Sequence, residues 1–220
     1  MKSKASGSLI RAGLFAALFL ALILLLKTVD VRPIGPNGSS VGLAACNQFW
    51  FELTGVHLLW YQITDWLGVA AVLTALGFAV LGLVQLVTGR SLRKVDGSLY
   101  ALGLLYLLVI AAYLFFEVNV VNCRPVLLDG RLEASFPSSH TMVVCCIMAS
   151  AMLQFRERFR SRRVLTVCNG VAALVMAVTV IGRLLSGVHW FTDILGGLLL
   201  SGALVSLYAA LCALWRKGKA

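Results

Sequence analysis

The stretch HWFTDILGGLLLSGALVSLYAALCAL, residues 189–214, decides the fold class. It places a histidine and an aspartate just ahead of a nearly uninterrupted apolar run, which is long enough to cross the roughly 30 Å hydrocarbon core of a bilayer as a helix. A helix satisfies its backbone polar groups internally, as a lipid environment requires. The stretch therefore predicts a membrane-spanning helix with polar side chains at its first turn.

Five further stretches are nearly as apolar. The 220 residues are 60% hydrophobic and 13% charged, with a mean hydropathy of +0.92, far above that of an ordinary soluble domain. We predict an all-α, six-helix transmembrane bundle that forms a single membrane-embedded domain over residues 1–220. The first apolar run ends at Lys27 without a small-residue cleavage site, which favours an anchor over a secretory signal. The predicted spans are Leu9–Leu26, Trp66–Val87, Leu99–Val118, Ser139–Phe155, Val164–Gly182 and His189–Leu214.

The positive charges are distributed unevenly along the chain. The net charge of the chain is +10, and most basic residues lie in segments that would share one membrane side. Short cytoplasmic loops carry such an excess, so both termini are predicted to be cytoplasmic. Nucleic-acid binding needs a basic surface or groove, so nucleic acid is not an expected partner. The basic residues assigned to the inner side are Lys2, Lys4, Arg11, Arg90, Arg93, Lys94, Arg156, Arg158, Arg160, Arg162, Arg163, Arg216, Lys217 and Lys219.

The segment from Leu43 to Trp66 mixes aromatic and polar residues. Aromatic amphipathic side chains prefer the headgroup level of a membrane, so we predict an interfacial amphipathic helix between the first and second spans. It could be an anchor that packs over the bundle or a lid beside a lipid entrance. Cys46 and Cys123 would both lie on the outer side, where a disulfide is an option.

Three polar clusters fall at the outer ends of predicted spans. Each cluster meets its span at the same membrane face, so the helices could gather all three around one site. Ionisable groups at such positions are costly unless exposed or paired, and they indicate function. The clusters are Glu117 with Asn119, Asn122 and Arg124; Pro137-Ser138-Ser139-His140; and Gly182-Arg183 with His189 and Asp193.

These residue types suit the binding of a phosphate group. Arg124 and Arg183 supply planar guanidinium forks for phosphate oxygens. Ser138 and Ser139 begin a predicted helix, whose free N–H groups and dipole attract an anion. Phosphoryl transfer needs such donors on the equatorial oxygens, together with a nucleophile and an acid. The two arginines would repel a cation, so a metal site at these clusters is disfavoured.

The two histidines can take different roles. His189 and Asp193 are four residues apart, so on a helix they share one face, and the carboxylate can hold the ring. The second ring nitrogen is then free to attack phosphorus. His140, with an ordinary pKa of about 6.5, can be protonated in an anionic pocket and donate to a departing oxygen.

The Pro137-Ser138-Ser139-His140 stretch and the spacing Arg183-x5-His189-x3-Asp193 resemble the second and third motifs of the type 2 phosphatidic acid phosphatase (PAP2) family. Arg124-Pro125 resembles the end of its first motif. The resemblance implies a six-helix membrane fold, no metal or other cofactor, and a phosphohistidine intermediate. It assigns His189 as nucleophile, Asp193 as its orienting partner and His140 as general acid. The phosphate-binding residues that it implies are Arg124, Arg183, Ser138 and the backbone of Ser139.

The sequence departs from the family pattern at three positions. Ser139 stands where the motif usually has Gly, and Gly182 where it usually has Ser. More importantly, Glu117 stands where the first motif begins with Lys. We expect Glu117 to pair with Arg124 or Arg183 and to tune the pocket. The alternative is an ordinary carboxylate at the headgroup boundary.

The expected function is a membrane lipid phosphatase with an extracytoplasmic site. Its substrate would be a phosphate or diphosphate monoester of a lipid: a polyprenyl diphosphate such as undecaprenyl diphosphate, phosphatidate or phosphatidylglycerol phosphate. A phosphotransferase would use the same residues, and a catalytically inactive protein of the same fold is a further alternative. A transporter fits poorly, because the spans hold almost no ionisable residues at midplane. The oligomeric state is left open.

Overall fold

The computed structural model describes residues 2–217, which fold into helices joined by loops and contain no β-strand in this range. The predicted all-α class is confirmed. The α-helices are α1 (Lys2–Thr28), α2 (Ala44–Thr54), α3 (Leu58–Gly89), α4 (Gly97–Val118), α5 (Ser139–Arg158), α6 (Arg162–Leu185) and α7 (Phe191–Lys217).

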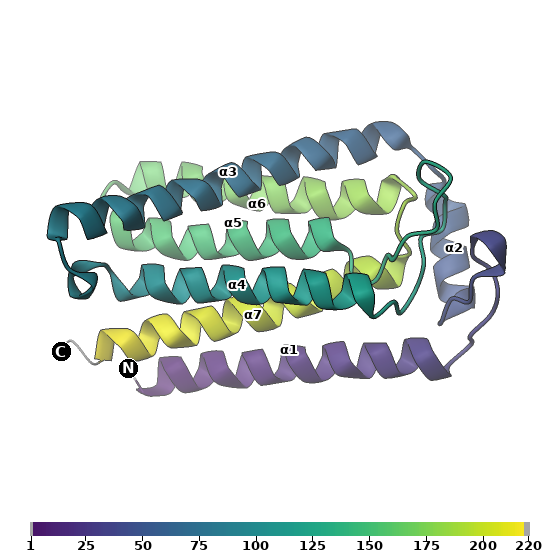
Figure 1. Ribbon diagram of the computed structural model, residues 1–220, viewed down its shortest axis with the longest axis horizontal. Coiled ribbons are helices and arrows are strands. Elements are labelled where there is room, and N and C mark those ends of the chain that lie inside the picture. Colours follow the sequence, from purple (N-terminus) through teal and green to yellow (C-terminus); the bar gives the residue numbers. More distant parts are fainter. Residues whose placement is uncertain (1, 218–220) are drawn as a thin grey trace.

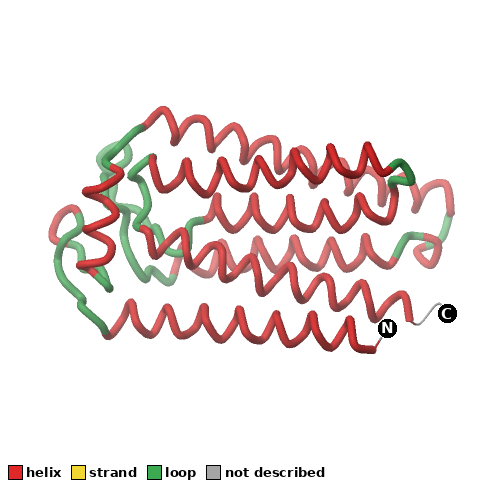
Figure 2. Tube along the Cα trace, turned by 180° about the vertical axis from the view of Figure 1, so that it is seen from behind, coloured by secondary structure: helices red, strands yellow, loops and turns green. Residues whose placement is uncertain are grey.

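All helices except α2 run side by side along the length of the molecule, and α2 lies across one end of them (Figure 1). The start of α1 and the end of α7 lie together at the opposite end, where α3–α4 and α5–α6 are joined by short connections. The view from behind shows the longer loops gathered at the α2 end (Figure 2). Lys219, one of the basic residues used to predict the topology, lies outside the described residues.

Five of the predicted spans are matched by helices that are long and apolar enough to cross a membrane: Ala5–Thr28, Leu58–Gly89, Gly97–Val118, Arg162–Leu185 and Phe191–Trp215. The chain is therefore a multi-pass membrane protein. Helix α5 is less apolar, because it packs against α3, α4, α6 and α7 and is largely enclosed by protein. Enclosure lets it carry buried polar residues such as Ser150 and Gln154. The count of six spans depends on α5 and stays a prediction.

The segment predicted as one interfacial helix, 43–66, is instead broken in two. Helix α2 ends at Thr54, Gly55 adopts a positive φ of 66°, and α3 begins at Leu58. Glycine pays little for this conformation, which commonly ends a helix. The second span therefore starts eight residues before the predicted Trp66, and Asp65 belongs to the spanning helix α3.

Helix α2 is fastened to the start of α7. Trp50 stacks on Phe191 with ring centroids 5.0 Å apart. The buried Asn47 accepts a hydrogen bond from the backbone N–H of Thr192 at 3.1 Å and donates to its hydroxyl at 3.0 Å. These contacts are those of an anchor packed over the bundle. The six cysteines are free, so the predicted option of a Cys46–Cys123 disulfide is wrong.

A small aromatic core lies under the loop that leads into α5. Phe136 is buried and stacks on Phe19 of α1 with ring centroids 5.8 Å apart. Gly197 of α7 permits this loop to approach closely, because a Cβ there would come within 2.9 Å of the Ser138 carbonyl oxygen. The start of α5 is therefore fixed against both α1 and α7.

Candidate functional site

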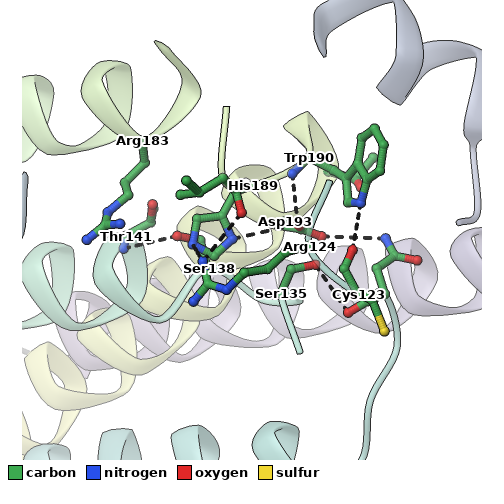
Figure 3. Close-up of polar contacts among 12 residues, drawn as sticks. Cys123, Arg124, Ser135, Ser138, Thr141, Arg183, His189, Trp190 and Asp193 are labelled. Carbon is green, nitrogen blue, oxygen red and sulfur yellow. Dashed lines mark hydrogen bonds and ion pairs between the residues drawn. The ribbon is translucent and has the colours of Figure 1, made fainter. Parts of the chain in front are cut away.

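The three polar clusters meet at the α2 end of the bundle. Figure 3 shows Arg124, Ser138, Arg183, His189 and Asp193 directed toward one region, although they come from two loops, α6 and α7. His140, at the start of α5, lies within electrostatic reach of Arg183, His189 and Arg124. The structure thus brings together the residues that the sequence had placed at separate helix ends.

His189 lies in the loop before α7, one residue before Trp190, and not on the helix as predicted. Its Nδ1 nevertheless faces Asp193, 3.7 Å from Oδ2, and the same oxygen accepts a hydrogen bond from the backbone N–H of the adjacent loop residue Trp190. The side chains of both residues are almost fully buried, at 1% and 0% exposure. Their proximity therefore depends on the loop conformation and not on helical spacing.

The Asp193 carboxylate is fixed by neighbouring donors. Oδ2 accepts a hydrogen bond from the backbone N–H of Trp190 at 2.9 Å, and Oδ1 accepts one from the Asn122 side chain at 3.5 Å. The Trp190 indole donates to the carbonyl of Cys123 at 2.8 Å. These bonds tie the loop before α7 to the loop after α4, so the carboxylate is held at one orientation.

Arg124 lies on the other side of His189. Its Nη1 is 3.3 Å from His189 Nε2, and its Nε donates to Glu133 at 2.9 Å. The pairing is built locally, since the Arg124 backbone N–H donates to the Glu133 carbonyl at 3.0 Å. The hairpin-like loop 122–135 therefore sets the guanidinium against the imidazole.

The charge state of His189 follows from this environment. Burial is the main cause that lowers its pKa well below the usual 6.5, and the positive charges of Arg124 and Arg183 add to the effect. The ring is therefore neutral at neutral pH. With Nδ1 facing a carboxylate, the favoured tautomer carries its proton there. Nε2 then carries the lone pair, which faces the Arg124 Nη1 donor at 3.3 Å.

The second motif forms the start of α5. Ser138 is the N-cap residue, and its hydroxyl accepts a hydrogen bond from Thr141 N at 3.5 Å. Its own backbone N–H donates to the Asp193 carbonyl at 2.9 Å. The first N–H groups of a helix lack intrahelical partners, and Ser139 lines the cavities described below.

Asp65 of α3 joins His140 to Arg183. One carboxylate oxygen, Oδ1, lies 3.0 Å from His140 Nε2 and also pairs with Arg183 Nη2. The Arg183 side chain is completely buried and stacks over the Tyr61 ring at 4.8 Å. Its Nε and Nη1 are buried donors without a hydrogen-bond partner among the described residues.

Glu117 does not make the predicted pair with either arginine. Glu133 pairs with Arg124 and Asp65 pairs with Arg183, while Glu117 is exposed at the last turn of α4. The prediction of a Glu117 ion pair is wrong because two carboxylates from other segments, Glu133 and Asp65, lie closer to the two guanidinium groups. Asp65 carried a signal that could have been used, since an acidic residue inside an apolar helix indicates function. Asn122 belongs to the first polar cluster of the sequence, but its contact with Asp193, like the Glu133–Arg124 ion pair, follows only from the loop geometry.

Two cavities flank the site. One, of about 210 Å³, is lined by Arg124, Glu133, Ser139 and His189, with Glu117 at its wall. The other is a mainly apolar groove of about 590 Å³ between α3 and α5, with Asp65 and His140 in its lining. Ser139 and Tyr113 line both. Within residues 2–217, no three His, Cys, Asp or Glu side chains are placed to hold a metal ion.

The helical bundle defines a multi-pass membrane protein, and its polar residues converge on a candidate site at one end. The sequence profile of the PAP2 superfamily matches residues 74–217, and the chain belongs to this superfamily. It is similar in fold to a transmembrane PAP2-type phosphatidylglycerolphosphate phosphatase from Bacillus subtilis. The two share 16% sequence identity and a TM-score of 0.58, over 95% of this chain and 96% of that one. No curated protein sequence matches the chain.

Proposed function

We propose that the protein is a metal-independent lipid phosphatase that forms a covalent phosphohistidine at His189. The observation that carries the proposal is the environment of this ring. Nε2 lies beside the Arg124 guanidinium at 3.3 Å, and the buried Asp193 lies behind Nδ1. A neutral imidazole beside an anion-binding guanidinium is suited to attack a phosphorus atom.

In the first step, His189 Nε2 attacks phosphorus in line with the lipid oxygen. The N–P bond forms as the bond between phosphorus and the lipid oxygen breaks, and His140 donates its proton to that oxygen. Arg124, Arg183 and the N–H groups at the start of α5 stabilise the charge on the equatorial oxygens. The products are a lipid alcohol, or a lipid monophosphate from a diphosphate, and the phosphohistidine.

In the second step, a water molecule replaces the lipid. His140, now neutral, accepts a proton from the water as its oxygen attacks phosphorus, and the N–P bond breaks to release inorganic phosphate. His140 thereby returns to its protonated form, and His189 to its neutral form. One histidine serves as acid and then as base, as microscopic reversibility requires.

A lipid substrate is supported by the groove beside His140. Val69, Val72 and Leu73 of α3 and Val143 of α5 line it, so an apolar chain there would place its phosphate at the polar end. A polyprenyl diphosphate, phosphatidate and phosphatidylglycerol phosphate all fit this description.

We propose an extracytoplasmic site with cytoplasmic termini. Two groups of basic residues, Arg90 to Lys94 and Arg156 to Arg163, occupy connections at the end of the bundle opposite the site. Short basic connections favour the cytoplasmic side, so the site would face outward.

The test is phosphate release by the purified full-length protein from a panel of lipid phosphates and diphosphates. We expect release by the wild type, little effect of chelators and only background release by His189→Ala. A phosphotransferase would instead pass the group to an added acceptor lipid, which product analysis detects. Equal phosphate release by folded His189→Ala would overturn the nucleophile assignment.

A further inference from the structure

We infer that Asp65 is a positioning residue of the proposed reaction, which holds Arg183 and His140 in their working geometry. The inference rests on the proposed function and adds a residue that lies outside the segment matched by the family, 74–217. Its basis is a single carboxylate oxygen that contacts both Arg183 Nη2 and His140 Nε2. These two contacts join α3, α5 and α6 at one point.

Arg183 needs such a partner because its side chain has no exposure to solvent. Leaving a buried guanidinium without a counter-ion is strongly unfavourable. Among the described residues, Asp65 is the only carboxylate in an ion pair with Arg183. It engages Nη2 and leaves Nε and Nη1 without partners. The carboxylate therefore fixes the fork from one side and leaves the other two donors without a protein partner.

His140 needs the same carboxylate for a different reason. The titratable groups that face it are Arg183 from α6, Arg124 from the loop after α4, His189 from the loop before α7, and Asp65 from α3. Asp65 is the anion of this set and lies 3.0 Å from Nε2. A protonated ring, which the acid step requires, is opposed first by burial and then by both guanidinium groups, and this carboxylate is the group that stabilises it.

Tight packing keeps Asp65 and His140 aligned. Gly68 lies one turn after Asp65, and a Cβ at this position would come 3.2 Å from His140 Cδ2. The imidazole therefore lies against the α3 backbone at a position where glycine leaves room for it. A larger residue at position 68 would push the ring away from this place beside the Asp65 carboxylate.

A carboxylate next to the phosphate site has opposite effects on catalysis and binding. Its negative charge repels the phosphate group, so removing the charge should not weaken ground-state binding. The same removal deprives His140 of its counter-ion and Arg183 of its orientation, which lowers the rate of the chemical step. We therefore expect Asp65 to affect kcat much more than KM.

The experiment uses the full-length enzyme and the lipid phosphate that the wild type hydrolyses fastest. For Asp65→Asn we expect kcat to fall by about 10- to 100-fold, as for a misplaced acid or clamp, with KM changed by less than about threefold. The alkaline limb of the kcat–pH profile should move to lower pH, because protonated His140 loses its stabilising charge. Asp65→Glu should restore part of the rate.

The matched control is Asp96→Asn. Asp96 is also a half-exposed aspartate paired with an arginine, Arg158 at 3.4 Å, but it lies at the opposite end of the bundle. Its replacement should leave kcat and the pH profile unchanged. Thermal unfolding of each variant checks that the fold is retained, and Asp65→Asn is chosen because it keeps the shape of the side chain.

The outcomes separate this inference from the function on which it rests. Absence of phosphate release by the wild type overturns the proposed function and this inference with it. Wild-type activity together with an unchanged kcat in Asp65→Asn overturns this inference alone. So does a raised KM with an unchanged pH profile, since that result describes a binding residue that does not act through His140.

Discussion

The two halves of the site differ in how their histidines are held. We call His189, Asp193 and Arg124 the His189 half, and His140, Asp65 and Arg183 the His140 half. The side chains of His189 and Asp193 are 1% and 0% exposed, whereas those of His140 and Asp65 are 33% and 39% exposed. The first half is enclosed by hydrogen-bonded loops, and the second opens to an apolar groove.

This difference fits the roles proposed for the two rings. A nucleophile must stay neutral and fixed, and burial among guanidinium groups disfavours its charged form. An acid must meet the departing lipid oxygen, so it has to face the side from which the lipid arrives. The enclosure of His189 and the exposure of His140 thus give two histidines the different properties that a nucleophile and an acid need.

After loss of the nucleophile His189, replacement of the acid should have the largest effect. For His140→Asn we expect kcat to fall by about 10²- to 10⁴-fold, the usual contribution of general acid–base catalysis. Rates with a lipid phosphate of known KM provide the measurement, and thermal unfolding checks the fold. A fully active His140→Asn enzyme would show that the open half does not supply the proton.

Replacement of the orienting carboxylate should come next. Asp193→Asn keeps the size of the side chain but offers an amide that favours the wrong His189 tautomer. We expect kcat to fall by about 10²-fold, with KM little changed. Because Asp193 also accepts the Trp190 N–H bond, loss of the fold has to be checked by thermal unfolding, and retention of wild-type kcat in a folded variant would contradict the orienting role.

The acid side of the pH profile distinguishes the enclosed ring from an ordinary histidine. Burial, together with Arg124 and Arg183, lowers the pKa of His189 well below its usual 6.5. The neutral, reactive form therefore persists as pH falls, and kcat/KM should stay constant to below about pH 6.5. Arg124→Gln removes one positive charge, so its acid limb should lie at higher pH than that of the wild type. An acid limb in the same place in both enzymes would show that Arg124 does not act on this ring.

The contacts that fasten α2 to the start of α7 should contribute to the stability of the fold more than to catalysis. Asn47→Ala removes buried hydrogen bonds to Thr192 and Gly42, which leaves backbone groups without partners. We expect a loss of about 1–3 kcal/mol of unfolding free energy and a modest fall in kcat. Replacing the exposed Gln48 of the same helix with Ala is the control. Equal melting temperatures for the two variants would argue against a stabilising role of the Asn47 contacts.

The smallest effect is expected at Glu117. It lines the smaller cavity without an ion pair among the described residues, so Glu117→Ala should fold normally. Removing a carboxylate that repels phosphate should lower KM by a few-fold, with kcat unchanged. Michaelis–Menten kinetics across the lipid panel measure this effect, and identical constants for every lipid would remove Glu117 from the pocket.

The sequence alone predicted most of the bundle, because membrane spans are determined by local composition. Runs such as 189–214 reveal themselves wherever about 20 apolar residues occur together. Predictions from local composition failed where tertiary contacts decide the structure. Helix α5 is less apolar than a lipid-facing helix because its neighbours enclose it. The break at Gly55 was missed because aromatic residues continue on both sides of it.

The candidate site divides in the same way. Type and spacing were enough to propose the motif residues His140, Arg183, His189 and Asp193, and the helix ends made their convergence plausible. Asp65 and Glu133 were not found as site residues, because a pairing between distant segments leaves no trace in local spacing. The expected helical register of His189 and Asp193 was wrong, although the two side chains do meet.

The amino-acid sequence by itself determined the membrane environment, the helical class and the residue types that we propose to bind phosphate. These follow from hydropathy and side-chain chemistry, which each residue carries wherever it lies. Only the tertiary structure decided which carboxylate pairs with which guanidinium and which histidine is enclosed. Those properties depend on distances of a few ångströms between α3, α5, α6 and two loops, and such distances exist only once the helices have packed.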